Sequence, residues 1–398
     1  MDDISVLICD DSALMRNLIG RIIDGTEGMK VVGKASNGQM ALEKIAETNP
    51  DIMVLDIEMP IMNGIEFLKA RKEKKIKVPV VVLSSVATKG AAITMQALEL
   101  GAADFITKPS GSVSADISEV ADQLIDMLAS YGSQYARRQG KIPYIPEFFQ
   151  KQRKLLKAES FVANKKADDN APVQKPKLDK AQIVSFNTVE RKEPVVVTPI
   201  REGGNIDVIA IGISTGGPNA LRDVFKMIDP RLKQPILVVQ HMPKGFTKAF
   251  AESLDKICPL SVKEAEEGEK ILGGHIYIAP GDNHITVVEK GPERVIHLTH
   301  DPQRNGHRPS ADVMFESIAK VYKNRALGVI MTGMGRDGAA ELAEMRRQGA
   351  WTLGQDEDSS IVYGMPRVAW EMGGVQKQVT LMKMADEISS LAREHLAS

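Results

Sequence analysis

The sequence has few cysteines, few aromatic residues and no long apolar run. Only two cysteines, Cys9 and Cys258, occur in 398 residues, which is typical of a protein kept in a reducing compartment. No apolar run approaches the roughly 20 residues that cross a bilayer, and the first residues lack the basic stretch of a secretory signal. We therefore expect a cytoplasmic protein with no direct membrane insertion.

An excess of charge of either sign is also missing. The 51 Lys and Arg nearly balance the 52 Asp and Glu, so the whole chain gives no electrostatic reason to expect nucleic acid as a partner. No H-E-x-x-H segment or cysteine cluster is present, and we expect no catalytic metal in the carboxyl-terminal half. We therefore expect no nucleic-acid partner.

The first part of the chain, residues 1–130, alternates short apolar runs with amphipathic stretches. The pattern predicts five strand-helix units with short connections, which form a parallel sheet covered by helices on both faces, as in flavodoxin-like domains. The expected strands are 6–9, 31–33, 52–55, 80–83 and 103–106. The expected helices lie near 13–25, 38–48, 64–73, 89–100 and 114–129.

Residues 131–203 have a different composition, with several prolines and little sustained periodicity. This stretch holds 15 Lys or Arg against 8 Asp or Glu. Such a segment is typical of a flexible, basic linker, with a short helix possible around 147–160. Its charge is usual for a solvated tether, and a specific anionic partner is the alternative interpretation.

The α/β pattern returns in residues 204–398, which we expect to form a second, doubly wound domain. Its expected strands are 208–211, 236–239, 276–279, 327–331 and 351–353, and its expected helices lie near 217–228, 246–256, 310–323, 338–348 and 381–396. Residues 285–289 and 294–298 flank Lys290-Gly291-Pro292 and predict a β-hairpin. The hairpin opens the possibility of a mixed sheet.

Polar residues follow the predicted strands of the first domain where the strands end. Asp10 and Asp11 follow the first strand, Asp56 ends the third, Ser84 follows the fourth and Lys108 lies just beyond the fifth. Strand ends of a parallel sheet meet at one edge, where three carboxylates need a cation, and oxygen ligands suit Mg²⁺. Each residue alone could be a turn former or a helix cap. Together they make the domain resemble the response-regulator receiver family.

That resemblance implies phosphorylation of Asp56 by a histidine kinase, with Mg²⁺ as the cofactor. The implied metal ligands are Asp10, Asp11, Asp56 and the backbone carbonyl of Glu58. The implied switch residues are Ser84, Phe105 and Lys108. On activation the Ser84 hydroxyl would move toward the phosphoryl group, and the Phe105 ring would rotate. A static core aromatic is the alternative interpretation of Phe105.

The second domain opens with a strand that runs into the glycine-rich turn 212–217, which contains Ser214. A serine on a tight strand-to-helix turn can act as a nucleophile, with backbone N–H groups at the helix start facing an oxyanion. A phosphate-binding turn and a plain turn are the alternatives. His241 follows the next strand and is the best candidate base, although a histidine there is more often a surface residue. Asp337, in a later glycine-rich turn, is either a helix cap or the acid that orients the imidazole.

The order Ser214, His241, Asp337 differs from the Ser, Asp/Glu, His order of α/β-hydrolases. The second domain is instead similar to the chemotaxis protein-glutamate methylesterases. The matching stretches are 212–217, 240–243, 277–282, 308–310, 332–338 and 364–366. The resemblance covers 204–398, and the linker is longer than is usual in that family.

The resemblance implies a catalytic triad of Ser214, His241 and Asp337. It implies hydrolysis of glutamate γ-methyl esters on methyl-accepting chemoreceptors, deamidation of glutamines, and control by phosphorylation of the receiver. Thr215 and Met334 match positions near the active site and are candidates for oxyanion or histidine positioning. Arg308 fits either substrate binding or a structural ion pair.

Two other classes of function remain open at this point. The second domain could be a non-enzymatic binding domain whose glycine turn holds a nucleotide phosphate, although it has no P-loop lysine. It could also be a DNA-binding output domain, although 382–394 is mixed in charge and does not form a basic recognition helix.

Overall fold

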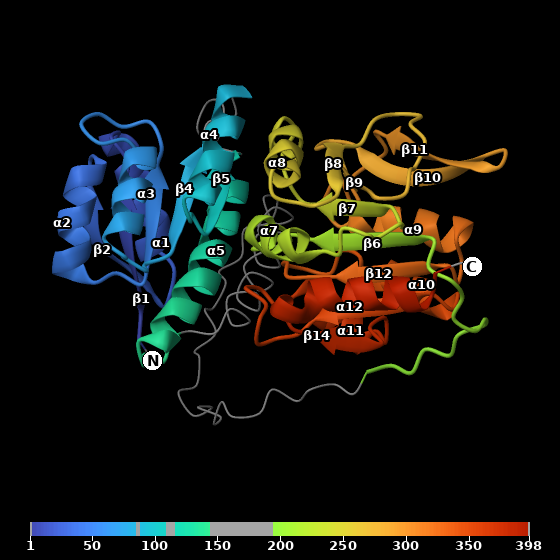
Figure 1. Cartoon of the computed structure of the whole chain (residues 1–398). Helices are drawn as coiled ribbons and strands as arrows, with labels where there is room; N and C mark the ends of the chain where they lie inside the picture. The colour runs from blue at the N-terminus through green and yellow to red at the C-terminus, as the bar shows by residue number, and fades with distance from the viewer. Residues whose placement is uncertain (1, 85–87, 109–115, 144–193, 397–398) are drawn as a thin grey trace, which may run out of the picture.

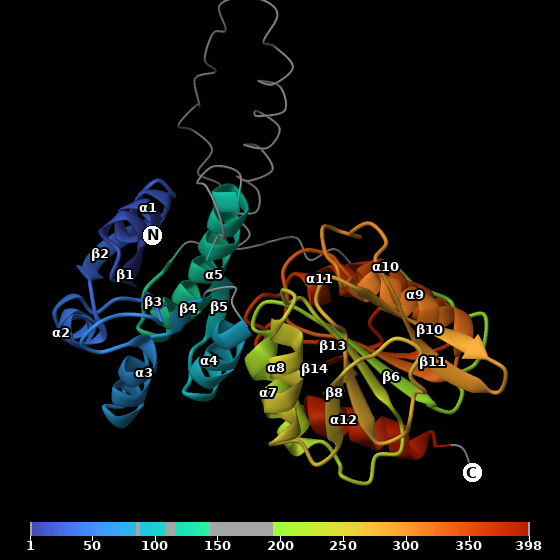
Figure 2. The ribbon, with the colours of Figure 1, turned by 90° about the horizontal axis from the view of Figure 1, so that it is seen from above.

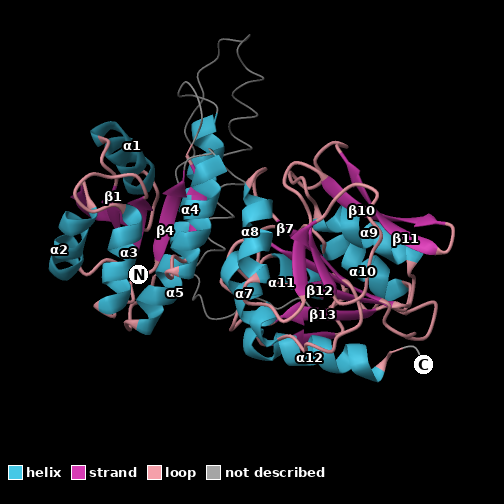
Figure 3. Cartoon of the chain, turned by 45° about the horizontal axis from the view of Figure 1, so that its top comes forward, coloured by secondary structure: helices cyan, strands magenta, loops and turns pink. Residues whose placement is uncertain are grey.

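The computed structural model describes residues 2–84, 88–108, 116–143 and 194–396. These residues form two α/β domains that lie side by side (Figure 1). Each domain has its own sheet with helices packed against it, as Figure 3 shows. The predicted short helix at 147–160 lies outside the described residues.

The amino-terminal domain is built on a five-stranded parallel sheet in the order β2-β1-β3-β4-β5. The central strands are buried on both faces because helices cover both, which explains their continuous apolar composition. The strands are β1 (Ile4–Cys9), β2 (Met29–Ala35), β3 (Ile52–Asp56), β4 (Val80–Ser84) and β5 (Asp104–Thr107). The predicted parallel sheet and its five strands are confirmed.

Four helices connect these strands and a fifth follows the last of them, and local capping groups mark where some of the helices begin. The Ser12 side chain accepts a hydrogen bond from Met15 N at the start of α1, and Asn63 and Glu66 form a reciprocal capping box on α3. The helices are α1 (Ala13–Asp24), α2 (Gly38–Thr48), α3 (Gly64–Glu73), α4 (Thr88–Glu99) and α5 (Asp116–Arg138).

Helix α5 continues beyond the predicted end at 129. The first residues of this extension still face the core, since Tyr131 is 6% exposed and a Cβ atom at Gly132 would lie 2.6 Å from Ile4. The prediction ended the helix too early because polar residues between these contacts hide the periodicity.

The second domain contains a seven-stranded sheet in the order β14-β13-β12-β6-β7-β9-β8, and all of its described strand pairs are parallel. The strands are β6 (Val208–Ile213), β7 (Ile236–Gln240), β8 (Ser261–Glu264), β9 (His275–Ile278), β12 (Ala326–Ile330), β13 (Trp351–Gln355) and β14 (Lys377–Val379). Apolar side chains of the central strands alternate between two core clusters, one on each face.

Helices cover both faces of this sheet, which confirms the doubly wound α/β prediction (Figure 2). One layer consists of α7 (Gly217–Met227), α8 (Phe246–Asp255) and α12 (Leu381–Glu394), and the other of α9 (Ala311–Val321), α10 (Ala339–Arg347) and α11 (Met365–Glu371). None of the described helices combines the length and apolar character that a bilayer-spanning helix needs.

The predicted hairpin forms, but the possibility of a mixed sheet was wrong. Strands β10 (His284–Lys290) and β11 (Glu293–Thr299) pair antiparallel in a separate two-stranded sheet. The hairpin packs against α9 and lies apart from the large sheet. Strands β8 and β14 and helix α11 were not predicted, because each is too short to show a clear apolar period.

The two domains pack against each other through α4 of the first and α7 and α8 of the second (Figures 1 and 2). The Phe105 ring stacks on the Phe246 ring with centroids 5.0 Å apart. Asn219 Nδ2 donates hydrogen bonds to the carbonyl oxygens of Ala102 and Ala103, at 3.0 and 2.9 Å. One apolar cluster is therefore continuous from the first sheet to the second.

Residues 194–205 form a strap, an extended segment that lies along the second domain before β6. Its backbone amides donate to that domain at three places: Val195 N to Glu371 O, Ile200 N to Arg347 O, and Gly204 N to Asn324 O. The predicted boundaries at 130/131 and 203/204 stay predictions.

Candidate active site

Ser214, His241 and Asp337 lie together at the carboxyl ends of neighbouring strands β6, β7 and β12. His241 Nδ1 is 3.1 Å from Ser214 Oγ, and His241 Nε2 is 2.8 Å from Asp337 Oδ2. Their elements are adjacent in the sheet order, so the parallel topology brings three distant segments to one edge. The structure thus assembles the three residues that the sequence singled out as a possible triad.

The imidazole of His241 presents Nδ1 to the serine and Nε2 to the carboxylate. An ionised carboxylate can only accept, so the proton of the neutral ring is assigned to Nε2. Nδ1 then carries the lone pair that accepts from the Ser214 hydroxyl. The arrangement makes His241 Nδ1 the atom able to take a proton from Ser214.

Asp337 has two structural roles at once. Its Oδ2 also accepts from Ala311 N at 2.6 Å, and its Oδ1 accepts from Ser310 Oγ at 2.6 Å and Asn305 Nδ2 at 2.9 Å. Burial would raise the pKa of Asp337, but the hydrogen bonds from His241, Ser310 and Asn305 outweigh it and hold the pKa well below its usual range. Asp337 therefore caps α9 while its charge stays available to His241.

A second histidine covers one face of the His241 ring. His307 stacks on His241 with ring centroids 3.8 Å apart and an interplanar angle of 18°. Burial, reinforced by His241, lowers the pKa of His307 to about 4. A neutral His307 can shield the His241 ring without repelling a proton that reaches it. The sequence analysis did not single out His307, because one of seven histidines carries no local signal of such a contact.

Glycines allow the loops of this site to approach each other closely. Gly216 has φ +81°, a left-handed conformation that favours glycine, directly before α7. A Cβ atom at Gly333 would lie 2.8 Å from Ser214 Cβ. Residues 333–338 have the spacing G-x-G-x-x-G between β12 and α10, which by itself would suit a dinucleotide. Because Gly333 packs on Ser214 and Asp337 is held by α9, these glycines bring the site loops together.

Three other predicted positions lie near the triad. The Thr215 carbonyl accepts from Thr332 Oγ1 at 3.0 Å, and Met334 follows Gly333 in the same loop. Roles of Thr215 and Met334 in oxyanion or histidine positioning stay predictions. Arg308 donates to Asp282 Oδ1 from Nε at 3.1 Å and from Nη2 at 2.7 Å. Of the two interpretations of Arg308, this contact favours the structural ion pair.

The receiver residues also meet at one edge of their sheet. Carboxylate oxygens of Asp10, Asp11 and Asp56 all lie within 4.8 Å of one another. Lys108 Nζ is 2.8 Å from Asp56 Oδ2 and 3.2 Å from Asp10 Oδ2. Asp10 Oδ2 is buried, and its contact among the described residues is the ion pair with Lys108. Three carboxylates facing one lysine leave an excess of negative charge, which fits a divalent cation with oxygen ligands.

The electrostatics at Asp56 also fit a site for cations and phosphate. Burial raises the pKa of Asp56, and the hydrogen bond and charge of Lys108 only partly oppose this effect. Glu58 lines a small hollow together with Asp56 and Lys108, and its backbone N lies 3.4 Å from Asp56 Oδ1. The Ser84 hydroxyl lies 2.6 Å from Thr94 Oγ1. Phe105 is 6% exposed and contacts the second domain, as described above.

Asp104 was missed by the sequence analysis, although it adjoins Phe105. Its Oδ2 accepts from Gly216 N of the second domain at 2.9 Å and lies 3.1 Å from the Tyr131 hydroxyl. Burial raises the pKa of Asp104 to about 6, against the hydrogen bonds from Gly216, Phe105 N and Tyr131. A lone Asp at the start of a strand gives no sequence signal of a partner in another domain.

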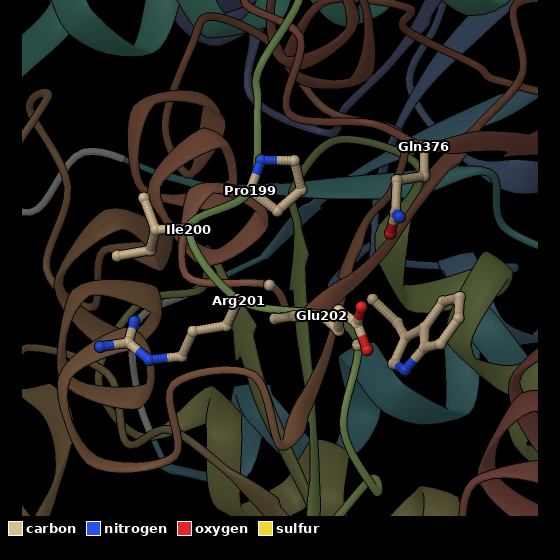
Figure 4. A pocket seen from close by; sticks show the side chains of 9 residues that line it. Pro199, Ile200, Arg201, Glu202 and Gln376 are labelled. Carbon is tan, nitrogen blue, oxygen red and sulfur yellow. The ribbon is translucent and has the colours of Figure 1, made fainter.

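A hollow of about 420 Å³ lies far from these residues, beside Trp351 at the amino end of β13 (Figure 4). The strap forms one of its walls, and its labelled lining residues are Pro199, Ile200, Arg201, Glu202 and Gln376. Ser214 lies beyond the opposite, carboxyl end of the sheet, and no predicted site residue lines this hollow. Its size therefore says nothing about the chemistry at Ser214.

The fold and site together define a class: a receiver domain joined to an α/β domain with the Ser-His-Asp geometry of a serine hydrolase. Family models agree with this division. Residues 6–115 match the response regulator receiver domain, and residues 209–388 match the CheB methylesterase domain.

Full-length relatives identify the family. A protein-glutamate methylesterase/protein-glutamine glutaminase of Treponema denticola is 52% identical and covers 99% of this chain and 100% of its own. One of Treponema pallidum is 45% identical and covers 100% and 99%. A solved CheB methylesterase catalytic domain from Thermotoga maritima is 35% identical, with a TM-score of 0.46 over 48% of this chain and 99% of its own. This chain belongs to the protein-glutamate methylesterase/protein-glutamine glutaminase family.

Proposed function

We propose that this protein hydrolyses glutamate γ-methyl esters on chemoreceptors, and deamidates receptor glutamines, under control of its receiver domain. The observation that carries the proposal is the chain of contacts from Ser214 Oγ through His241 to Asp337, at 3.1 and 2.8 Å. The names of the full-length relatives supply the substrate class. Bacterial chemotaxis adaptation is the process that such a reaction serves.

The reaction proceeds by covalent catalysis. Ser214 Oγ attacks the ester carbonyl while its proton passes to His241 Nδ1, and backbone N–H groups stabilise the oxyanion. Methanol leaves with a proton from His241, and the acyl-enzyme remains. Water then attacks that intermediate, with His241 again accepting the proton. Collapse of the second tetrahedral intermediate breaks the bond to Ser214 Oγ, which takes the proton back from His241, and the free glutamate side chain is released. Asp337 keeps the ring in the required tautomer and stabilises its charged form. A glutamine amide would follow the same path and release ammonia.

Control starts at Asp56, which we propose as the phosphoacceptor for the histidine kinase of the pathway. Asp10, Asp11, Asp56 and the Glu58 carbonyl would hold Mg²⁺, which when bound neutralises charge on the phosphoryl oxygens. Lys108, 2.8 Å from Asp56, adds a second positive charge. Ser84 and Phe105 are the candidate switch residues. A cytoplasmic location stays a prediction.

The packing of the receiver on α7 and α8 supports restraint of the hydrolase before phosphorylation. Asp104 contacts Gly216 in the turn after the nucleophile, and Phe105 contacts Phe246 in the segment after His241. Phosphorylation would have to favour the undocked arrangement through differential contacts. The linker would then keep the domains near each other.

The direct test is methanol release from membranes that carry radiolabelled, methylated chemoreceptors. The wild-type protein should release methanol, and Ser214→Ala should reduce release to the level without enzyme. Exposed Lys226 on α7 offers a matched control, because Lys226→Ala changes a side chain that faces solvent. Equal rates for wild type and Ser214→Ala would remove Ser214 from the mechanism.

A further inference from the structure

Gln240 is a buried residue that contacts the backbones of both the nucleophile and the base. It ends β7, is 2% exposed, and pairs in register with Ile213, the residue before Ser214. Its Nε2 donates to the carbonyl oxygen of Ser214 and to that of His241, each at 3.1 Å. One buried amide therefore joins the backbones of both residues.

The orientation of this amide follows from its neighbours. The reverse orientation would place Oε1 against two carbonyl oxygens, so the donor group is assigned to the position between them. Oε1 then has no hydrogen-bond partner among the described residues. A buried oxygen left unpaired is unfavourable for stability. This cost favours a role in placing the site over a role in stabilising the fold.

Gly217 supplies the space that this arrangement needs. A Cβ atom at Gly217 would lie 2.0 Å from Gln240 Oε1 and 2.9 Å from its Cδ. Any side chain there would push the amide away from the two carbonyl groups. Glycine is thus needed at position 217 to leave space for the Gln240 amide, whereas Gly216 is favoured by its positive φ.

We propose that Gln240 is a positioning residue that fixes the separation of Ser214 and His241 for proton transfer. The inference rests on the proposed hydrolase function and adds a residue that acts through the other two. Loss of its two hydrogen bonds would let the strand ends shift relative to each other. A misplacement of about 1 Å can lower a catalytic rate about 100-fold, so kcat should fall while KM stays nearly constant.

A fluorophosphonate probe tests this inference separately from the substrate assignment, because it labels an activated serine without a receptor. Gln240→Met keeps the volume and removes both donors. Gln234→Met is the matched control: Gln234 lies just before β7, is 3% exposed, and donates from Nε2 to Ala392 O at 2.7 Å. In the full chain, Gln240→Met should label Ser214 about 100-fold more slowly. Gln234→Met should label at the wild-type rate, although both lower the melting temperature.

Two further variants distinguish positioning from general damage. Gly217→Ala leaves Gln240 chemically intact and should slow labelling by displacing its amide. The deficit of Gln240→Glu relative to wild type at the same pH should shrink as the pH falls, because a protonated carboxyl can donate to one carbonyl, whereas the deficit of Gln240→Met should be independent of pH. Wild-type labelling in Gln240→Met and Gly217→Ala would overturn the inference, as would equal losses in Gln240→Met and Gln234→Met. A wild-type protein unlabelled at Ser214 would instead count against the proposed function.

Discussion

The carboxylate of Asp104 accepts a hydrogen bond from the backbone N–H of Gly216 at 2.9 Å, although the two residues belong to different domains. Gly216 lies two positions after Ser214, directly before α7. The receiver therefore contacts the turn that carries the candidate nucleophile. Contacts of this kind are the physical basis on which docking of the receiver can affect the hydrolase.

Weakening the domain contact should raise activity before phosphorylation. Asn219→Ala removes two hydrogen bonds to the receiver backbone, each worth about 1 kcal/mol, and alanine suits a helix. Their loss, about 2 kcal/mol in all, should raise the basal methylesterase rate by up to about 30-fold, with the fully phosphorylated rate unchanged. The measurement is methanol release with and without acetyl phosphate, with Lys226→Ala as the control on the same helix. An unchanged basal rate in Asn219→Ala would argue against restraint by docking.

Docking should also depend on pH through Asp104. Burial raises the pKa of Asp104 from its ordinary value of 3.8 to about 6. We expect undocking to expose the carboxyl group and return its pKa toward the ordinary value, so the docked form keeps a proton that the undocked form releases between these values. Docking is therefore favoured at the low end of this window and weakens as the pH rises through about 6. Energy transfer between dyes on the two domains, followed from about pH 4 to about pH 7.5, should report this change and level off above about pH 6.

Asparagine at position 104 provides the control for that titration. Asp104→Asn can still accept from Gly216 N–H but does not titrate, so its energy transfer should be constant over the same range. The residues around the carboxyl group, Tyr131 and the backbone of Phe105, stay the same in the variant. The same pH dependence in Asp104→Asn would assign the effect to another group.

Phosphorylation should require Asp56. Asp56→Asn removes the nucleophilic carboxylate while keeping a similar shape beside Lys108, and we expect no activation by acetyl phosphate with Mg²⁺. Basal methanol release should stay close to the wild-type rate, because Asp56 lies in the receiver and does not contact the triad. Normal activation of Asp56→Asn would show that another residue accepts the phosphoryl group.

Asp337→Asn should separate the two roles of Asp337. With the amide nitrogen in place of Oδ2, Oδ1 still accepts from Ser310 Oγ and Asn305 Nδ2, but Ala311 N loses its acceptor, so the melting temperature should fall modestly. It cannot stabilise a charged imidazole, and its amide disfavours the required tautomer of His241, so kcat should fall by about 10⁴-fold. The rate of methanol release and the thermal unfolding curve measure the two effects. A large loss of stability with kcat intact would assign only the capping role to Asp337.

Much of this architecture could be predicted from the sequence, because both sheets are parallel and buried. Buried strands such as Ile52–Asp56 are continuous apolar runs that end in polar residues, and a parallel sheet collects those polar residues at one edge. The grouping of Ser214, His241 and Asp337 follows from the same topology.

The features that escaped prediction depend on contacts between distant segments. The partners of Asp104 and His307 belong to other loops or another domain, and neither residue has a distinctive neighbour pattern. The role of Gln240 depends on side-chain rotation at a strand end. The sequence predicted the hairpin that pairs Ile285 with Leu298, but it did not predict that the hairpin forms a sheet of its own. The pattern of a hairpin carries no information about which further strands pair with it.

The strap over residues 194–205 determines how the hydrolase could be prepared alone. A fragment that begins at residue 204 would lose the backbone hydrogen bonds of Val195 and Ile200. It would also uncover Gly373, whose missing Cβ leaves just enough room for the Val195 carbonyl. Expression of a truncated enzyme should therefore start no later than Pro194, so that the fragment keeps its own outer layer.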